Sequence, residues 1–228
     1  MEKKRLFHSR IRTALLTTTL AVVLVMCFTA VHAHASTENQ HASYKKLIHE
    51  YHLALAGKKI NRSVITPAQS GLETGGICHW KGSRLIIPKP VSANKPRLAY
   101  TYVDIDHDGQ DEIVFSQMPS STDPGCLNSL WTVKSGKAVP VIHSTYRNPF
   151  EILSKKGYLM KEQSGGVDTI YTSFYRLSNG KLTKVCVAKK DGNHFHKNSR
   201  KISRTAYKKL MKKYGHPRTI SSGWTRVK

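Results

Sequence analysis

Residues 98–115 read LAYTYVDIDHDGQDEIVF, and this stretch places an acidic loop between two strand-forming segments. The first segment is rich in Tyr, Thr and Val and the second reads Ile-Val-Phe, so both flanks favour β-strands. The loop carries five acidic side chains within nine residues: Asp104, Asp106, Asp108, Asp111 and Glu112. Carboxylates packed this closely repel one another unless a cation lies among them. The sequence therefore predicts a strand, a metal-binding loop and a second strand.

Calcium is the cation that this loop favours, because it prefers oxygen ligands held on a flexible turn. Side-chain oxygens fall at positions 1, 3, 5 and 9 counted from the first aspartate, position 7 offers a backbone carbonyl, and Gly109 permits the bend. The predicted ligands are Asp104, Asp106, Asp108, Gln110 and Glu112. We expect Asp111 and His107 to point outward. A solvated acidic turn without an ion is the alternative.

An EF-hand does not fit the same residues. That loop requires a bidentate glutamate at position 12, where this chain has Phe115. Its flanks are helical, whereas both flanks here favour strands. We expect one bound ion with a structural role, because the ligands gather only when the chain is folded.

Residues 1–35 have the composition of a secretory signal peptide. A basic start precedes an apolar stretch over about residues 14–30, and Ala33-His34-Ala35 is a small-x-small cleavage site. An uncleaved membrane anchor is the alternative, but the stretch is short for a span and contains threonines. A lipoprotein would need a small residue before Cys27, where Met26 stands. We expect a secreted or cell-surface chain of residues 36–228 with no transmembrane span.

The chain is strongly basic, with a formal net charge of +23 at pH 7. Residues 181–228 hold 15 lysines and arginines and one acidic residue, Asp191. On an exported protein such a segment attracts anionic partners, so we expect anionic polymers such as wall polyanions, with lipid head groups and free nucleic acid as further possibilities. No specific nucleic-acid partner is expected, because the aromatic residues of this segment suit helix packing as well as base stacking. A charge that serves solubility alone is the competing interpretation.

The cysteines of residues 36–228 are Cys78, Cys126 and Cys186. An exported protein can keep disulfides. Cys78 and Cys126 lie in turn-rich segments beside glycines, so we predict a disulfide between them. Cys186 lies in the strand-like segment Val185-Cys186-Val187, which predicts a buried free thiol.

Helical periodicity occurs near both ends of the predicted mature chain. In residues 37–56 the apolar positions Tyr44, Ile48, Tyr51 and Leu55 recur at helical spacing, and a glycine follows. Residues 204–214 repeat the pattern with four lysines on the opposite face, a serine before the first residue and a glycine after the last. We therefore predict an N-terminal and a C-terminal helix.

Turn chemistry between the two helices predicts hairpins. Ser135-Gly136 and Asn179-Gly180 each separate two strand-like segments, and Asn-Gly is the strongest short hairpin signal. The predicted fold class is α+β: one antiparallel β-meander of roughly five to seven strands flanked by the N-terminal and C-terminal helices. Residues 36–228 would form a single domain with a basic C-terminal segment.

No recognisable catalytic arrangement stands out in the sequence. It contains no G-x-S-x-G, and its S-x-x-K matches lack the companion motifs of penicillin-binding enzymes. His194 and His196 could contribute to a zinc or copper site, but a third ligand is missing nearby, and a plain basic surface is the simpler interpretation. Catalysis is left open, and a non-enzymatic protein is favoured.

The order of these features resembles a family of small secreted or lipid-anchored proteins of Gram-positive bacteria, largely without assigned function. The shared features are the loop D-I-D-x-D-G-x-x-E-I, the hairpins W-x-V-x-x-G-K and N-G-K-L, and the closing helix Y-x-x-L-x-x-K-Y-G. The loop itself is similar to the strand-flanked calcium loop of FG-GAP and VCBS-type repeats, with Glu112 where aspartate is usual. The resemblance implies one calcium loop, because the motif occurs once and a propeller would repeat it in each blade. It implies no catalytic residues.

Two functions follow from these observations. The first is an exported, non-enzymatic, calcium-stabilised protein that associates electrostatically with anionic cell-wall or surface polymers. The second is a secreted hydrolase that acts on cell-wall or extracellular polymers through a site that the sequence does not reveal.

Overall fold

The computed structural model describes residues 41–70, 72, 79–86, 98–117, 127–144, 149–220 and 223–227. The predicted signal peptide and both cysteines of the predicted Cys78–Cys126 disulfide lie outside the described residues. Strands dominate the part that is described, and every strand pair in it is antiparallel.

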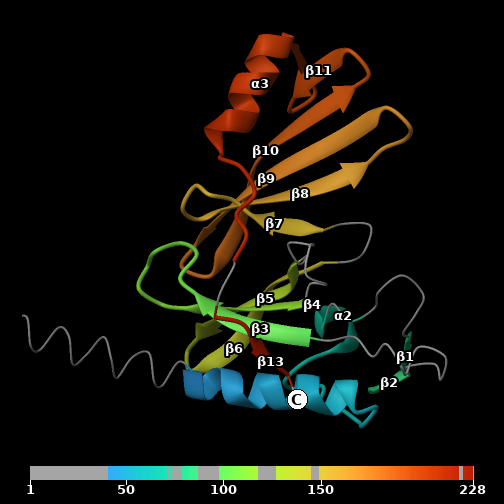
Figure 1. Ribbon diagram of the computed structural model, residues 1–228, viewed down its shortest axis with the longest axis vertical. Coiled ribbons are helices and arrows are strands. Elements are labelled where there is room, and N and C mark those ends of the chain that lie inside the picture. Colours follow the sequence, from blue (N-terminus) through green and yellow to red (C-terminus); the bar gives the residue numbers. More distant parts are fainter. Residues whose placement is uncertain are drawn as a thin grey trace, which may run out of the picture. The chain divides into compact units, whose positions relative to one another are not determined.

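The predicted N-terminal helix is confirmed over residues 41–55, the blue helix of Figure 1. It ends where Gly57 takes a φ of +67°, and the Gly57 N–H donates to the carbonyl of Ala54 at 2.9 Å. Tyr44 and Tyr51 on its inner face are completely buried, and the Tyr51 ring stacks on Phe115 with ring centroids 4.0 Å apart. The helix is thus fixed to the strands by large aromatic side chains.

The first group of strands surrounds the acidic loop. It comprises β3 (Leu98–Val103), β4 (Glu112–Gln117), β5 (Leu127–Lys134), β6 (Lys137–His143) and the short β13 (Thr225–Arg226). β3 pairs with β4, β4 with β5 and β5 with β6, while β13 pairs with the outer edge of β3. β1 (His79–Lys81) and β2 (Arg84–Ile86) form a separate two-stranded sheet, and α2 (Pro67–Ser70) is a single helical turn.

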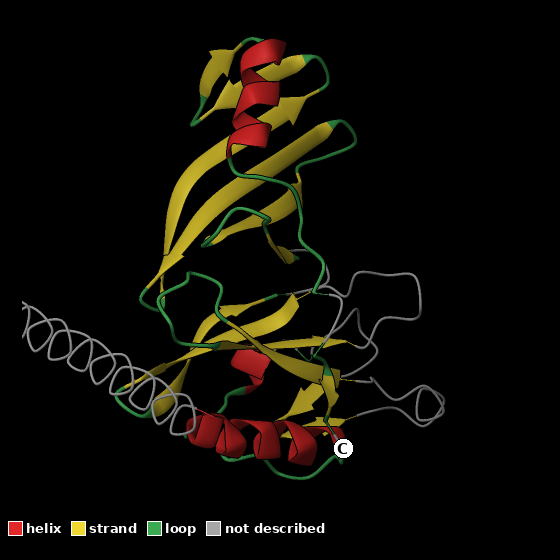
Figure 2. Ribbon diagram, turned by 60° about the vertical axis from the view of Figure 1, so that its left-hand side comes forward, coloured by secondary structure: helices red, strands yellow, loops and turns green. Residues whose placement is uncertain are grey.

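The second group of strands carries the C-terminal helix. It comprises β7 (Phe150–Ile152), β8 (Tyr158–Ser164), β9 (Thr169–Ser178), β10 (Lys181–Asp191), β11 (His194–Lys197) and β12 (Arg200–Ile202). The predicted helix is confirmed as α3 (Arg204–Lys213), and the Ser203 side chain caps it by accepting from the N–H of Ala206. α3 lies against one face of these strands in Figures 1 and 2. Cys186 is free and buried beneath it, as predicted.

The prediction of a single meander flanked by two helices is wrong. The strand order runs β12-β11-β10-β9-β8-β7-β5-β4-β3-β13, with β6 beside β5 off this path. Two strands depart from a simple meander: β7 follows β6 in sequence but bridges to β5, and β13 returns from the C-terminal end to pair with β3. The protein is mostly β, and α2 is a third, short helix. The predicted pattern failed because these short strands are placed by distant partners rather than by local sequence.

Both predicted hairpin turns are confirmed. Ser135 and Gly136 join β5 to β6 with φ values of +49° and +71°, and Asn179 and Gly180 join β9 to β10 with +49° and +63°. Two successive residues with positive φ form the turn whose twist matches that of the flanking strands. Leu177, two residues before the second turn, packs in the same cluster as Ile105 of the acidic loop.

A hydrophobic cluster joins the two strand groups beside this loop. Ile105 of the loop and Leu130 of β5 pack in the same cluster as Leu159 of β8 and Leu177 of β9. All four side chains are at most 3% exposed. An apolar residue of the loop is therefore anchored in the core, while the flanking aspartates lie nearer the surface.

Candidate metal centre

Three aspartates of the loop converge. Asp104, Asp106 and Asp108 each place a carboxylate oxygen within 4.8 Å of the other two. This group could hold a metal ion, because one oxygen from each residue can reach a common centre. The described residues contain no other cluster of three such ligands, so His194 and His196 are not joined by a third ligand there.

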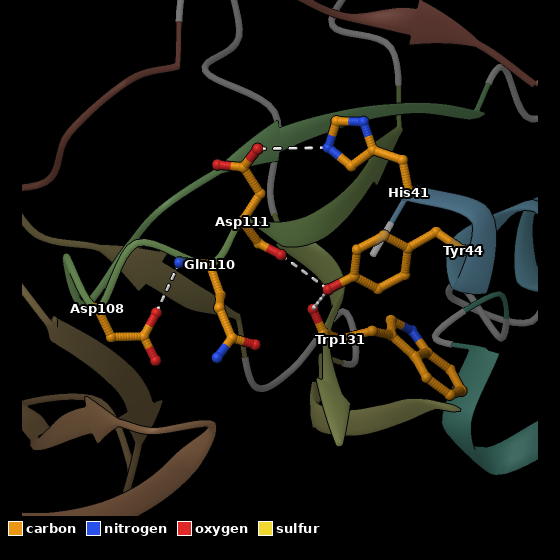
Figure 3. A network of polar contacts seen from close by, with 6 residues as sticks. All are labelled: His41, Tyr44, Asp108, Gln110, Asp111 and Trp131. Carbon is orange, nitrogen blue, oxygen red and sulfur yellow. Dashed lines mark hydrogen bonds and ion pairs between the residues drawn. The ribbon is translucent and has the colours of Figure 1, made fainter. Parts of the chain in front are cut away.

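One oxygen of each aspartate holds the loop backbone in place. The Gly109 N–H donates to Asp104 Oδ2 at 3.1 Å, and the Asp108 N–H donates to Asp106 Oδ1 at 3.3 Å. The Gln110 N–H donates to Asp108 Oδ1 at 2.8 Å, as Figure 3 shows. These bonds curl the chain around the carboxylates, and each aspartate keeps its second oxygen for another partner.

Two of the second oxygens are buried without a protein partner. Asp104 Oδ1 and Asp106 Oδ2 are shielded from solvent and accept no hydrogen bond from the described residues. A buried oxygen without a partner is costly, and two negatively charged ones at one point are more so. A bound cation would satisfy both oxygens at once. A solvated acidic turn would instead leave its carboxylate oxygens in contact with water, from which these two are shielded.

Backbone conformation supports the same geometry. Gly109 has a φ of +87°, as the predicted bend requires, and His107 has a φ of +60°. A left-handed conformation at a residue with a side chain costs about 1 kcal/mol and persists where surrounding contacts impose it. The His107 side chain is exposed, in agreement with the prediction that it points outward.

Glu112 is the first residue of β4 and follows the three aspartates and Asp111 in sequence. Its side chain is completely buried, and its Oε2 accepts the N–H of Ile105 at 3.0 Å. Its Oε1 lies 3.4 Å from the Thr132 hydroxyl, which donates to it. The pKa of Glu112 is raised to about 8, chiefly by burial. The hydrogen bond from Ile105 lowers this pKa, and the charges of the neighbouring aspartates raise it.

The role of Glu112 and Gln110 as ligands stays a prediction. Neither residue belongs to the converging group of three aspartates. The charges of all three aspartates nevertheless raise the pKa of the Glu112 carboxylate. Burial also raises the pKa of Asp106, with Asp108 as the next cause. A divalent cation would reverse both effects, because it stabilises the ionised carboxylates.

Asp111 belongs to a different contact. Its Oδ2 lies 3.3 Å from His41 Nε2, and its backbone carbonyl accepts the Tyr44 hydroxyl at 2.8 Å (Figure 3). The Tyr44 hydroxyl also lies 3.4 Å from the carbonyl of Trp131. Asp111 therefore ties the end of the loop to the helix over residues 41–55 and does not join the converging aspartates. Sequence reasoning placed Tyr44 only on the inner face of a helix and did not single out His41, because nothing in the local sequence links either residue to the loop.

The turn between β7 and β8 holds the loop from the other side. The Gly157 N–H donates to the carbonyl of Ile105 at 2.8 Å, and the Gly157 carbonyl accepts the N–H of Leu177 at 2.8 Å. A Cβ at position 157 would lie 3.1 Å from the carbonyl oxygen of Leu177 and 3.6 Å from the Asp106 Cα. Gly157 therefore allows the loop, this turn and β9 to approach closely.

Replacing Gly157 with Ala is expected to destabilise the protein more than the same change at Gly136. Both glycines have nearly the same φ, +72° and +71°, but a Cβ at position 136 meets open space. The shared backbone cost is about 1 kcal/mol, and the contact with Leu177 adds about 1 kcal/mol more. Thermal melts of the two variants measure the difference. Equal losses would show that the loop is not tightly packed against this turn.

Comparison with family models, curated proteins and solved structures gives no match for this chain. The resemblance to secreted proteins with one calcium loop therefore stays a prediction. None of the described helices has the length and apolar character that crossing a bilayer requires.

Proposed function

We propose that the protein is an exported, non-enzymatic binding protein that calcium stabilises and that associates electrostatically with anionic cell-wall or surface polymers. The observation that carries the metal assignment is the pair of buried, unpartnered oxygens on Asp104 and Asp106. The observation that carries the polymer assignment is the concentration of basic residues in β10, β11, β12 and α3. Export rests on the signal-like composition of residues 1–35.

Calcium suits the donor set better than other common metals. The converging groups are all carboxylates, and the loop adds neither cysteine nor histidine to them. Hard oxygen donors favour calcium or magnesium over zinc and copper, and calcium accepts the irregular geometry that a flexible loop offers. With Gln110 and Glu112 included, the loop would supply the ligands for a calcium site of moderate affinity.

The proposed role of the ion is structural. Ile105 joins the cluster between the two strand groups, and the Gly157 turn donates to its carbonyl. An ion held by Asp104, Asp106 and Asp108 would fix the backbone on both sides of Ile105. It would therefore stabilise the contact between the loop and the β7–β8 turn, without taking part in any reaction.

Electrostatic binding predicts a specific dependence on salt. The protein is expected to bind a linear polyanion, with log K falling linearly as log salt rises, because each neutralised charge releases a counterion. Fluorescence anisotropy with a labelled polymer measures the slope. Polymer length, followed by gel electrophoresis, is expected to stay constant. Shortening of the polymer would favour the secreted hydrolase instead, and an absence of binding at low salt would refute the proposed partner.

A further inference from the structure

The strands β8 to β12 present two faces, and α3 covers one of them. Phe174 of β9 and Cys186 of β10 are paired across the strands and pack in the same cluster as Leu210 and Tyr214 from α3 and the residue that follows it. The Phe174 and Tyr214 rings stack with centroids 4.4 Å apart. Because side chains alternate along a strand and directly paired residues share a face, the register identifies the residues of the opposite face.

One row of directly paired residues crosses all five strands on the face opposite α3. It consists of Gln163, Tyr171, Lys189, His196 and Lys201. The same register places Lys161 of β8 and Lys184 of β10 on this face, because they pair with Ser173 and Tyr175. We call Lys161, Lys184, Lys189 and Lys201 the lysine face.

Aromatic rings hold three of these lysines in place. Lys189 Nζ lies 5.6 Å from the Tyr171 ring centroid, Lys184 Nζ 5.7 Å from that of Tyr175, and Lys161 Nζ 5.7 Å from that of Phe150. A cation over a ring loses part of its conformational freedom before any partner arrives. The ammonium groups are therefore preorganised, and binding an anion there costs less side-chain entropy than at freely moving lysines.

The lysine face stays positively charged, because few acidic residues of these strands lie on it. β8 to β12 are fully described and contain two acidic residues, Glu162 and Asp191. Glu162 pairs with Thr172 on the side of α3. Asp191 lies on the lysine face, where it accepts from Lys189 at 2.8 Å and from the Thr169 hydroxyl at 3.0 Å. Lys161, Lys184 and Lys201 have no ion-pair partner among the described residues.

The arrangement suits a linear polymer that carries phosphates. Lys161, Lys189 and Lys201 belong to β8, β10 and β12, so successive lysines stand two strands, or about 10 Å, apart across the sheet. A polymer chain with regularly repeated negative charges that crosses the sheet would contact each of these three lysines. The Tyr171 and Tyr175 rings already face lysines, which leaves less ring surface for stacked bases.

We propose that the lysine face binds a linear phosphodiester polymer through its phosphate groups, independently of any bases. This inference rests on the proposed function and locates its binding surface. A base-free polyol phosphate and a nucleic acid share this chemistry, and the choice of probes separates them.

The test compares two variants that lose equal charge. In the first, Lys161, Lys184, Lys189 and Lys201 are all changed to Gln. In the second, the exposed lysines of α3 are changed to Gln: Lys208, Lys209, Lys212 and Lys213. The probes are an abasic deoxyribose-phosphate oligomer and an oligothymidylate of equal length, followed by anisotropy at several salt concentrations.

We expect the first variant to bind the abasic oligomer at least about tenfold more weakly, with the salt slope reduced by about 2 to 3, and the α3 variant to change less than about threefold. A third variant that keeps Lys189, and so its ion pair with Asp191, should show most of this loss, which excludes loss of that ion pair as its cause. Equal losses in the lysine-face and α3 variants would overturn the location and leave the proposed function intact. Much tighter binding of the oligothymidylate would overturn phosphate recognition. A wild-type protein that binds neither probe would remove the proposed function itself.

Discussion

Chelation of calcium is expected to lower the midpoint of thermal unfolding by about 5–10 °C. Calcium sites on exported proteins bind with dissociation constants on the order of 0.1 mM, so calcium at about 10 mM is a hundredfold excess. Binding to the folded state alone then contributes about 2.7 kcal/mol. In a chain of this size that free energy corresponds to several degrees. Differential scanning fluorimetry with calcium and with EDTA measures the shift.

Two variants make this result specific to the loop. Changing Asp104 and Asp108 together to Ala removes two of the three converging carboxylates, and the variant is expected to melt at one temperature with or without calcium. Asp111→Asn is the matched control, because it removes a loop carboxylate that contacts His41 rather than the cluster. It should keep the calcium shift. A double variant that still responds to calcium would place the ion elsewhere.

Without calcium, stability is expected to fall as the pH rises from about 4.5 to about 8. Burial raises the pKa of Glu112 from an ordinary 4.5 to about 8, so the folded protein holds a proton there that the unfolded chain releases. The stabilisation is complete below pH 4.5 and is lost as the pH rises through the folded pKa. Its size is about 3–5 kcal/mol. Calcium favours the ionised carboxylate, so the stabilisation that calcium provides should be larger at pH 8 than at pH 5.

Glu112→Gln isolates this group. The amide cannot ionise, and its oxygen can still accept the Ile105 N–H. In EDTA, urea unfolding of the variant should lose most of the pH dependence between 4.5 and 8. If the wild type and the variant show the same slope, another group is responsible and Glu112 is not held in its protonated form.

The features that the sequence predicted correctly depend on neighbouring residues. Asn179-Gly180 forms its turn because both residues accept positive φ, and α3 begins directly after Ser203 because a serine can cap a helix. The three aspartates converge because their alternating spacing and Gly109 curl a short loop. Each of these arrangements is determined within about ten residues.

The features that the sequence did not reveal depend on residues far apart in the chain. β13 pairs with β3, and β11 reads His-Phe-His-Lys, which shows no clear strand pattern until the long β10 pairs with it. The contact of Tyr44 with the Asp111 carbonyl and that of Gly157 with Ile105 likewise join distant segments. Local propensity cannot predict such pairs, because they form only when the core assembles.

Isothermal titration calorimetry of the purified protein with calcium tests the central claim most directly, because it detects occupancy of the acidic loop itself. One site with a dissociation constant on the order of 0.1 mM is expected in the wild type, and none in the variant lacking the Asp104 and Asp108 carboxylates. A wild-type protein that takes up no calcium at millimolar concentrations would contradict the account.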